Sequence, residues 1–150
     1  MNYLFDTNIL VYLIRKHPLG DLIIREFDPF GPQNITMISI VTQGEILSLC
    51  YLFGWGEQKK LSLTKLLNQF LIIPIEAKDI VDVYAEIDAF SKGKLPDKPL
   101  PVGMTARNVE KNDLWIAATA FVTKSTLLTT DEDFDHLDPQ FIDVVKLKAQ

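Results

Sequence analysis

Short apolar runs alternate along the chain with longer segments in which apolar residues recur at helical spacing. The short runs predict strands and the periodic segments predict helices. The expected strands span residues 1–5, 34–39, 71–75, 125–129 and 142–145. The expected helices span residues 9–14, 19–27, 41–53, 57–70, 77–90 and 112–123, with a short helical turn at 133–137. This alternation predicts a single α/β domain with a mostly parallel central sheet and helices on both faces.

Residues 91–112 break this alternation. The segment contains three prolines and two glycines and has no persuasive apolar period. Its basic residues outnumber its acidic residues five to two, although the whole chain has 15 basic and 20 acidic residues and a net charge of −5. A loop of this length in a compact domain is usually functional or mobile. Two interpretations remain open, a loop that binds a partner and a solvated loop that happens to be basic.

The composition limits the class of protein. A chain of 150 residues with 47% hydrophobic residues can form one self-sufficient core, which excludes intrinsic disorder. The acidic net charge argues against a generic basic nucleic-acid-binding module. Cys50 is the single cysteine and lies in an apolar context, which favours a buried thiol. No apolar run approaches membrane-span length, and the first residues lack a basic signal region, so we expect a cytoplasmic protein without a membrane partner.

Four acidic residues occupy positions where a solvated surface acid is not the simplest explanation. Asp6 and Asp131 each follow an apolar predicted strand, Asp113 begins an apolar helix, and Glu45 lies one turn into another helix. Taken singly, the three aspartates could cap helices and Glu45 could be a partly exposed helix acid. The α/β arrangement would instead gather all of them at one end of the sheet, beyond the carboxyl ends of the strands, where ligands bind.

Electrostatics then indicates a chemistry for such a cluster. Two carboxylates about 4 Å apart repel by about 4 kcal/mol at an effective dielectric constant of about 20. Converging acids therefore need cations, or some of them must be protonated. Carboxylate ligands without a Cys or His cluster favour Mg²⁺ or Mn²⁺ over Zn²⁺. Because divalent ions held by carboxylates suit phosphoryl chemistry, the pattern indicates hydrolysis of a phosphodiester.

The sequence resembles the PIN-domain ribonucleases, most closely the VapC-like toxins of bacterial toxin–antitoxin systems. The resemblance covers essentially the whole chain and is carried by YLFDTNIL at 3–10, Glu45, NDLWIAA at 112–118 and LLTTDEDF at 127–134. It implies a single PIN-like domain over residues 1–150 and a Mg²⁺-dependent endoribonuclease, with Mn²⁺ as a possible substitute. It also implies an RNA substrate, a cognate antitoxin protein as partner, and a homodimer for which the apolar early helices offer a surface.

The resemblance also implies roles for individual residues. Asp6, Glu45, Asp113 and Asp131 would be the metal-binding and catalytic acids, Thr7 would orient a water molecule, and Asn112 would support the site or the helix start. The fourth acid has several candidates because Asp131, Glu132, Asp133 and Asp135 crowd together. We prefer Asp131, which lies nearest the strand end, and expect Asp133 to cap the following turn.

Other functions and residues receive simpler interpretations. A catalytically silent PIN-fold module for RNA or protein binding is the main alternative, and a phosphate-accepting receiver or phosphatase is disfavoured because Thr7 and Asn8 stand where it would need an acid. We expect structural roles for His17, His136, Trp55 and Trp115 and a solvated helix face at Lys59 and Lys60. In the basic segment, we hypothesise that Lys98, Arg107 or Lys111 contacts RNA phosphates or the partner protein.

Overall fold

The computed structural model describes residues 1–76 and 78–149, and within them five strands form one all-parallel sheet. The strand order is β3-β2-β1-β4-β5. The strands are β1 (Asn2–Phe5), β2 (Ile35–Ser39), β3 (Leu71–Ile73), β4 (Thr126–Thr129) and β5 (Asp143–Lys146). The helices are α1 (Thr7–Ile14), α2 (Pro18–Phe27), α3 (Ile40–Leu52), α4 (Glu57–Leu67), α5 (Lys78–Ser91), α6 (Lys111–Thr123) and the 3₁₀ helix η1 (Glu132–Leu137).

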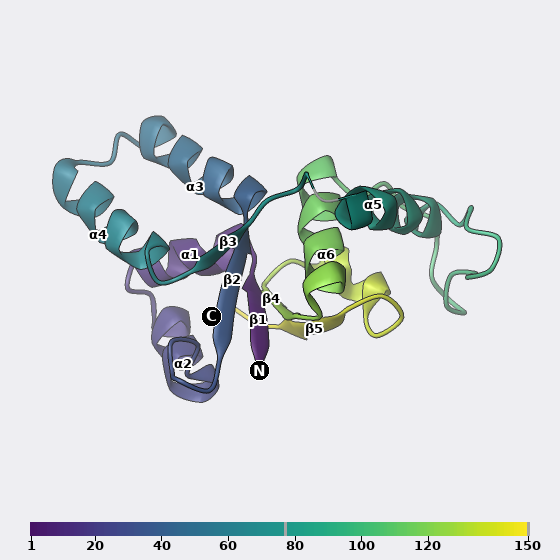
Figure 1. Ribbon diagram of the computed structural model, residues 1–150, viewed down its shortest axis with the longest axis horizontal. Coiled ribbons are helices and arrows are strands. Elements are labelled where there is room, and N and C mark those ends of the chain that lie inside the picture. Colours follow the sequence, from purple (N-terminus) through teal and green to yellow (C-terminus); the bar gives the residue numbers. More distant parts are fainter. Residues whose placement is uncertain (77, 150) are drawn as a thin grey trace.

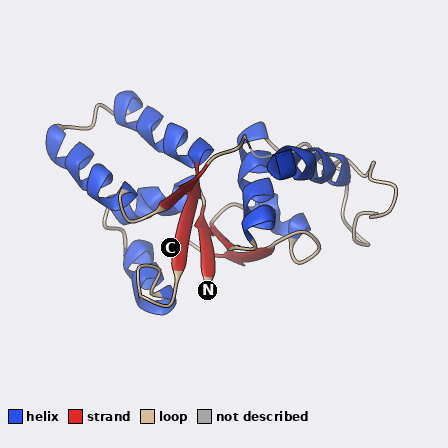
Figure 2. Cartoon of the chain, viewed as in Figure 1, coloured by secondary structure: helices blue, strands red, loops and turns tan. Residues whose placement is uncertain are grey.

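The sheet separates two hydrophobic cores. Side chains alternate along each strand, so Tyr3 and Phe5 of β1 enter one core while Leu4 enters the other. Helices α1 to α4 cover the first face, and α5, α6 and η1 cover the second (Figures 1 and 2). The predicted α/β class, with helices on both faces, is confirmed.

Element ends differ from the prediction where local chemistry overrides the apolar pattern. Strand β3 ends at Ile73, before Pro74, whose nitrogen carries no hydrogen for a sheet hydrogen bond. Helix α4 ends at Leu67, and Phe70 instead turns back into the core, where its ring contacts Phe5 and Phe30 edge-on. Helix α1 begins two residues earlier than expected, at Thr7. The predicted start of the fifth helix, residue 77, lies outside the described residues.

Several expectations for single side chains are confirmed. Cys50 is buried, and Trp55 is buried at the edge of the first core beneath the ammonium group of Lys59. His17 is the N-cap of α2, where its Nδ1 accepts a hydrogen bond from the backbone of Leu19 at 3.1 Å. Trp115, expected in the core, is only partly buried.

The apolar side chains of the early helices serve mainly the first core. Ile9 and Leu10 of α1 and Leu19 and Ile23 of α2 are buried there. The surface that these helices leave for a second copy of the chain is therefore smaller than their apolar content suggests. Among the described residues, no helix combines the length and the apolar character needed to cross a bilayer.

Residues 92–110 of the basic segment connect α5 to α6 without a helix or strand of their own and extend away from the sheet (Figure 1). Several contacts hold the segment to the domain, including two that involve its basic residues. The backbone amide of Arg107 donates to the carbonyl of Ser91 at 2.8 Å, and the ammonium group of Lys98 lies 4.3 Å from the centre of the Phe141 ring. The expected long loop is confirmed.

His136 is buried, and only one of its two ring nitrogens has a hydrogen-bond partner among the described residues. The Ser91 hydroxyl donates to the carbonyl of Ile87 at 2.8 Å, so the His136 Nε2, 2.7 Å from the same oxygen, is the donor to it. Among the described residues, the His136 Nδ1 has no hydrogen-bond partner. Burial, with the nearby charge of Arg107, lowers the pKa of His136 to about 4.

This histidine predicts acid sensitivity of folding. Its pKa falls from 6.5 in the unfolded chain to about 4 in the folded protein, so its contribution to stability is complete above about pH 6.5 and is lost as the pH falls toward 4. We expect a slope of up to about 1.4 kcal/mol per pH unit from this one group. Urea unfolding between pH 7.5 and 4.5 measures the free energy of unfolding as a function of pH. His136→Gln should reduce the slope of this dependence, and an unchanged slope in this variant would show that His136 is not its cause.

Candidate metal centre

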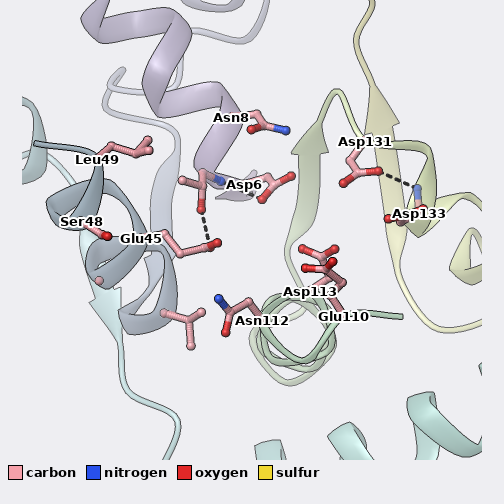
Figure 3. A pocket seen from close by; sticks show the side chains of 13 residues that line it. Asp6, Asn8, Glu45, Ser48, Leu49, Glu110, Asn112, Asp113, Asp131 and Asp133 are labelled. Atoms are coloured by element: carbon pink, nitrogen blue, oxygen red, sulfur yellow. Dashed lines mark hydrogen bonds between the residues drawn. The ribbon is translucent and has the colours of Figure 1, made fainter. Parts of the chain in front are cut away.

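A cleft of about 830 Å³ lies beyond the carboxyl ends of β1 and β4. The chain leaves β1 toward β2 on one side of the sheet, whereas β4 pairs with β1 on the other side. This reversal opens a crevice between the connections, which is the usual ligand site of an open parallel sheet. The cleft is lined by Asp6, Thr7, Asn8, Val41, Gly44, Glu45, Ser48, Leu49, Glu110, Asn112, Asp113, Asp131 and Asp133 (Figure 3).

Asp6 is buried at the centre of the cleft floor. Its backbone amide continues the β1–β4 ladder by donating to the carbonyl of Leu128 at 3.0 Å. Its carboxylate accepts two hydrogen bonds of 2.7 Å, from the backbone amide of Thr7 and from the Thr129 hydroxyl. Thr129 also accepts a hydrogen bond from the backbone amide of Asp131 at 2.9 Å. One threonine therefore fixes the first and fourth predicted acids relative to each other.

Glu45 enters the cleft from the opposite side, on α3. The Thr7 hydroxyl donates to its Oε1 at 2.7 Å, which connects the first turn of α1 to α3 (Figure 3). Thr7 is itself buried. Because a hydrogen bond to a charged group is among the stronger kinds, this contact restrains the Glu45 carboxylate within the cleft.

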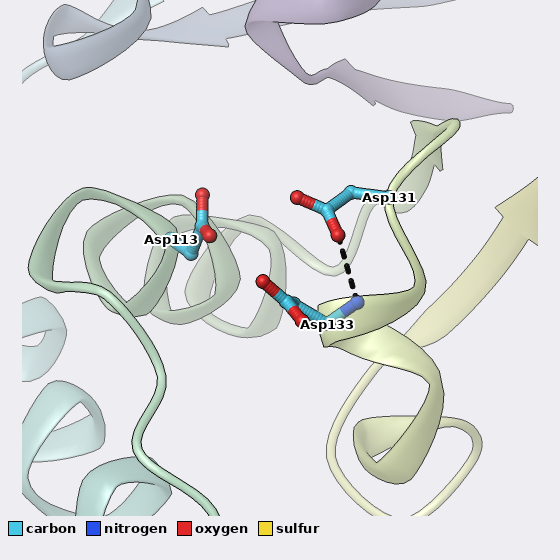
Figure 4. Close-up of side chains that lie close together, drawn as sticks. All are labelled: Asp113, Asp131 and Asp133. Atoms are coloured by element: carbon cyan, nitrogen blue, oxygen red, sulfur yellow. Dashed lines mark hydrogen bonds between the residues drawn. The ribbon is translucent and has the colours of Figure 1, made fainter.

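The third part of the site is a cluster of Asp113, Asp131 and Asp133, each with a carboxylate oxygen within 4.8 Å of the other two (Figure 4). The expectation that Asp133 caps the following turn is wrong. Asp131 is the N-cap of η1, and its Oδ1 accepts the backbone amide of Asp133 at 2.9 Å. This bond uses one oxygen of Asp131, and the turn that it closes carries the Asp133 carboxylate toward Asp113.

The electrostatics of the cleft are those of crowded negative charge. Burial raises the pKa of Asp6 to about 6, against the lowering effect of its two hydrogen bonds and with further raising by Asp131 and Glu45. Burial raises the pKa of Asp113 to about 7, and repulsion from Asp6, Asp131, Glu45 and Asp133 adds to it. Burial followed by the charge of Asp131 also raises the pKa of Asp133. The cleft thus favours a proton or a cation near neutral pH.

The remaining lining residues add polar groups. Asn112 and Asp113 lie in the first turn of α6, which begins at Lys111 rather than at 112. The Asn112 amide points into the cleft between Glu45 and Asp113, while Asn8 lies at the other end beside Asp131 (Figure 3). Thr129 was not among the predicted site residues. Its signal in the sequence is a hydroxyl residue at the end of an apolar strand, two positions before an expected site acid.

These donors fit a hard divalent cation. The acidic side chains offer only oxygen ligands, and neither histidine of the chain lines the cleft. Asp113, Asp131 and Asp133 could share one ion, and Asp6 and Glu45 line the same cleft. Oxygen-only ligand sets suit hard divalent ions such as Mg²⁺, Mn²⁺ and Ca²⁺.

Comparison with known proteins agrees with this fold. Residues 3–139 match the PIN domain family model. The chain is 30% identical over 131 residues to Ribonuclease VapC2 of Rickettsia felis, covering 87% of each protein. Among solved structures it is similar to VapBC2 from Rickettsia felis bound to a promoter DNA fragment (TM-score 0.71, 23% identity, 99% and 100% of the two chains). It is also similar to VapBC-1 from nontypeable Haemophilus influenzae (TM-score 0.72, 21% identity, 97% and 98% coverage). The chain therefore belongs to the PIN-domain family, as a VapC-like member.

Proposed function

We propose that this protein is a Mg²⁺-dependent endoribonuclease and the toxin of a toxin–antitoxin pair. The observation that carries the proposal is the convergence of Asp6, Glu45, Asp113 and Asp131 in one cleft at the ends of the parallel strands. The similarity to a protein named Ribonuclease VapC2 supports RNA as the substrate. A silent interaction module would not need to keep the pKa of Asp113 raised to about 7 by burial and by four neighbouring acids.

Each residue has a part in the proposed reaction. Asp6, Glu45, Asp113 and Asp131 would hold Mg²⁺, or Mn²⁺ in its place, and Asp133 joins them from the η1 turn. When bound, such an ion makes water more acidic and offsets charge on the phosphate.

The neighbouring side chains would position these acids and the substrate. Thr129 and the Thr7 amide hold Asp6 in place, and the Thr7 hydroxyl holds Glu45. We assign the Asn112 amide to donate a hydrogen bond to a phosphate oxygen, since it points into the cleft from its rim (Figure 3).

The proposed protein partner is a cognate antitoxin. The similar structures of VapBC-1 and VapBC2 carry names that describe paired components, which supports a partner for this chain. At the end of α3, Tyr51, Leu52 and Phe53 are 86%, 73% and 59% exposed, so a run of apolar side chains faces solvent there. Such a patch is typical of a protein-binding surface. A homodimer remains part of the proposal, without a surface assigned to it.

Replacement of the central acids tests the reaction. We expect Asp6→Asn and Asp113→Asn each to lower the rate of Mg²⁺-dependent RNA cleavage by at least about 100-fold, the order found for loss of one charge-stabilising group. Asp21→Asn, an exposed aspartate of α2, is the matched control and should cleave normally. Cleavage of total cellular RNA with Mg²⁺, Mn²⁺ or EDTA measures the effect; full activity in either site variant, or cleavage in EDTA, would contradict the proposal.

The same Asp113→Asn variant should be more stable than the wild type in EDTA at pH 8. The pKa of Asp113 is raised from 3.8 to about 7, so its contribution to stability is complete below about pH 4 and is lost as the pH rises through 7. Removing the charge removes that loss. Thermal unfolding at pH 8 and pH 5 measures it: the stabilisation should shrink at pH 5, and destabilisation at pH 8 would show that the acids are not in mutual repulsion.

The contact between Thr7 and Glu45 has a separate test. Thr7→Val keeps the shape but removes the hydroxyl, so we expect about tenfold slower cleavage, the size of one hydrogen bond to a charged group. Thr7→Ser restores the hydroxyl and should recover most of the rate and of the Mg²⁺ affinity measured by calorimetry. If Thr7→Ser were as slow as Thr7→Val, the hydroxyl would not be the relevant group.

The basic segment offers groups for RNA phosphates. Arg107 lies close enough to Asp133 to oppose the rise in its pKa, and Lys111 is exposed at the start of α6. We expect Arg107→Glu and Lys111→Glu to weaken RNA cleavage and to reduce its dependence on salt, because each removes a phosphate contact. Lys65→Glu on α4 is the control. Cleavage rates measured at 50 to 300 mM salt give the slope of log rate against log salt for each variant. If the slopes of Arg107→Glu and Lys111→Glu equalled that of the control, these residues would not contact RNA phosphates.

A further inference from the structure

A second hollow of about 660 Å³ adjoins the acidic cleft. Asn8 and Asp131 line both spaces, and both residues lie at the end of the cleft away from Asn112 and Glu110 (Figure 3). A chain that leaves the metal centre at this end therefore enters the second hollow directly. Its volume lies within the ordinary range for small-molecule sites.

The lining of this hollow differs from that of the acidic cleft. Its cationic groups are Lys146, at the end of β5, and Lys148, just beyond it, and its aromatic group is Tyr12 of α1. Lys148 is exposed and has no ion pair within the part of the chain that the structure describes. Lys146 pairs with Asp135, but both side chains are about one-third exposed. An ion pair this exposed contributes little to stability, so a phosphate can compete with Asp135 for Lys146. Glu132 is a further acid on this wall beside Asp131.

The ring of Tyr12 is placed where a nucleobase could stack on it. Its ring packs against that of His17, with the ring centres 4.8 Å apart, which fixes its orientation. The side chain is only partly buried and forms part of the wall of the hollow. A held aromatic ring beside two ammonium groups and the exposed Asn8 amide matches the components of single-stranded nucleic acid, which are stacked bases and regularly spaced phosphates.

We propose that the second hollow is a subsite for single-stranded RNA on one side of the cleaved bond, with phosphates at Lys146 and Lys148 and a base on Tyr12. The inference rests on the proposed ribonuclease function and assigns residues that the metal centre does not use. Continuity through Asn8 and Asp131 favours RNA over a protein partner, because the occupant of the hollow runs directly into the catalytic cleft.

The test compares the cleavage of RNA substrates of different lengths. A short single-stranded RNA that the protein cleaves is extended by one to three nucleotides on the 5′ side or on the 3′ side, and kcat/KM is measured for each. We expect extension on one side to raise kcat/KM about tenfold in the wild type, the size of one stacked base with its phosphate. Extension on the other side should affect the wild type and Lys146→Gln/Lys148→Gln equally.

Two variants separate the base from the phosphates. Lys146→Gln/Lys148→Gln should lose most of the gain and reduce the slope of log kcat/KM against log salt by about 1.4, or about 0.7 for each contact with a single strand. Tyr12→Leu should lose the gain from a normal nucleotide but keep the salt slope, and an abasic extension should not distinguish it from the wild type. Lys65→Gln/Lys124→Gln is the matched control, and thermal unfolding checks that each variant folds.

The outcomes separate this inference from the function on which it rests. A wild type that cleaves no RNA with Mg²⁺ overturns both. A wild type that cleaves RNA but shows the same gain as Lys146→Gln/Lys148→Gln, or no gain from either extension, overturns the subsite alone. If Lys146→Gln/Lys148→Gln or Tyr12→Leu lost binding to the purified antitoxin but kept the cleavage kinetics of the wild type, the hollow would be a protein interface. That result also overturns the subsite.

Discussion

The site depends on a buried carboxylate, that of Asp6, at the point where the strand order of the sheet reverses. Burial without compensation would leave this group neutral. Two hydrogen bonds from α1 and β4 stabilise its charged form, yet burial still dominates and the pKa stays near 6. The same bonds connect Asp6 to Thr7 and Thr129, which in turn hold Glu45 and Asp131. The positions of Glu45 and Asp131 relative to Asp6 therefore depend on these two threonines.

The second constraint is that these acids repel one another. A domain stabilised only by its two cores could avoid this by spreading the acids over its surface. Here the parallel strands, the first turn of α6 and the η1 turn carry acids into one cleft. Burial, with added repulsion from these acids, raises the pKa of Asp113 to about 7. The free energy that the cores contribute offsets this repulsion. Sites that bind cations commonly show such a conflict between stability and function.

Much of the fold, and the convergence of the four predicted acids in one cleft, could be predicted from the sequence. Apolar runs such as residues 1–5 and helical stripes such as 77–90 located the strands and helices, and parallel connectivity placed Asp6 and Asp131 at the same edge. The misplaced details have local causes. Which aspartate caps η1 depends on backbone direction after Thr130, and the pattern of four nearby acids does not encode it. The role of Thr129 depends on the register between β1 and β4, which pairs Phe5 with Leu128.

The most direct test of a site that uses a divalent ion and water is the chemistry of the RNA ends that it produces. A uniform single-stranded RNA is cleaved with Mg²⁺, and the new ends are identified by mass spectrometry, with an EDTA reaction beside it. Attack by water predicts a linear phosphate on one end and a hydroxyl on the other, and no products in EDTA. Products with a 2′,3′-cyclic phosphate, formed by the neighbouring 2′-hydroxyl and unaffected by EDTA, would contradict the account.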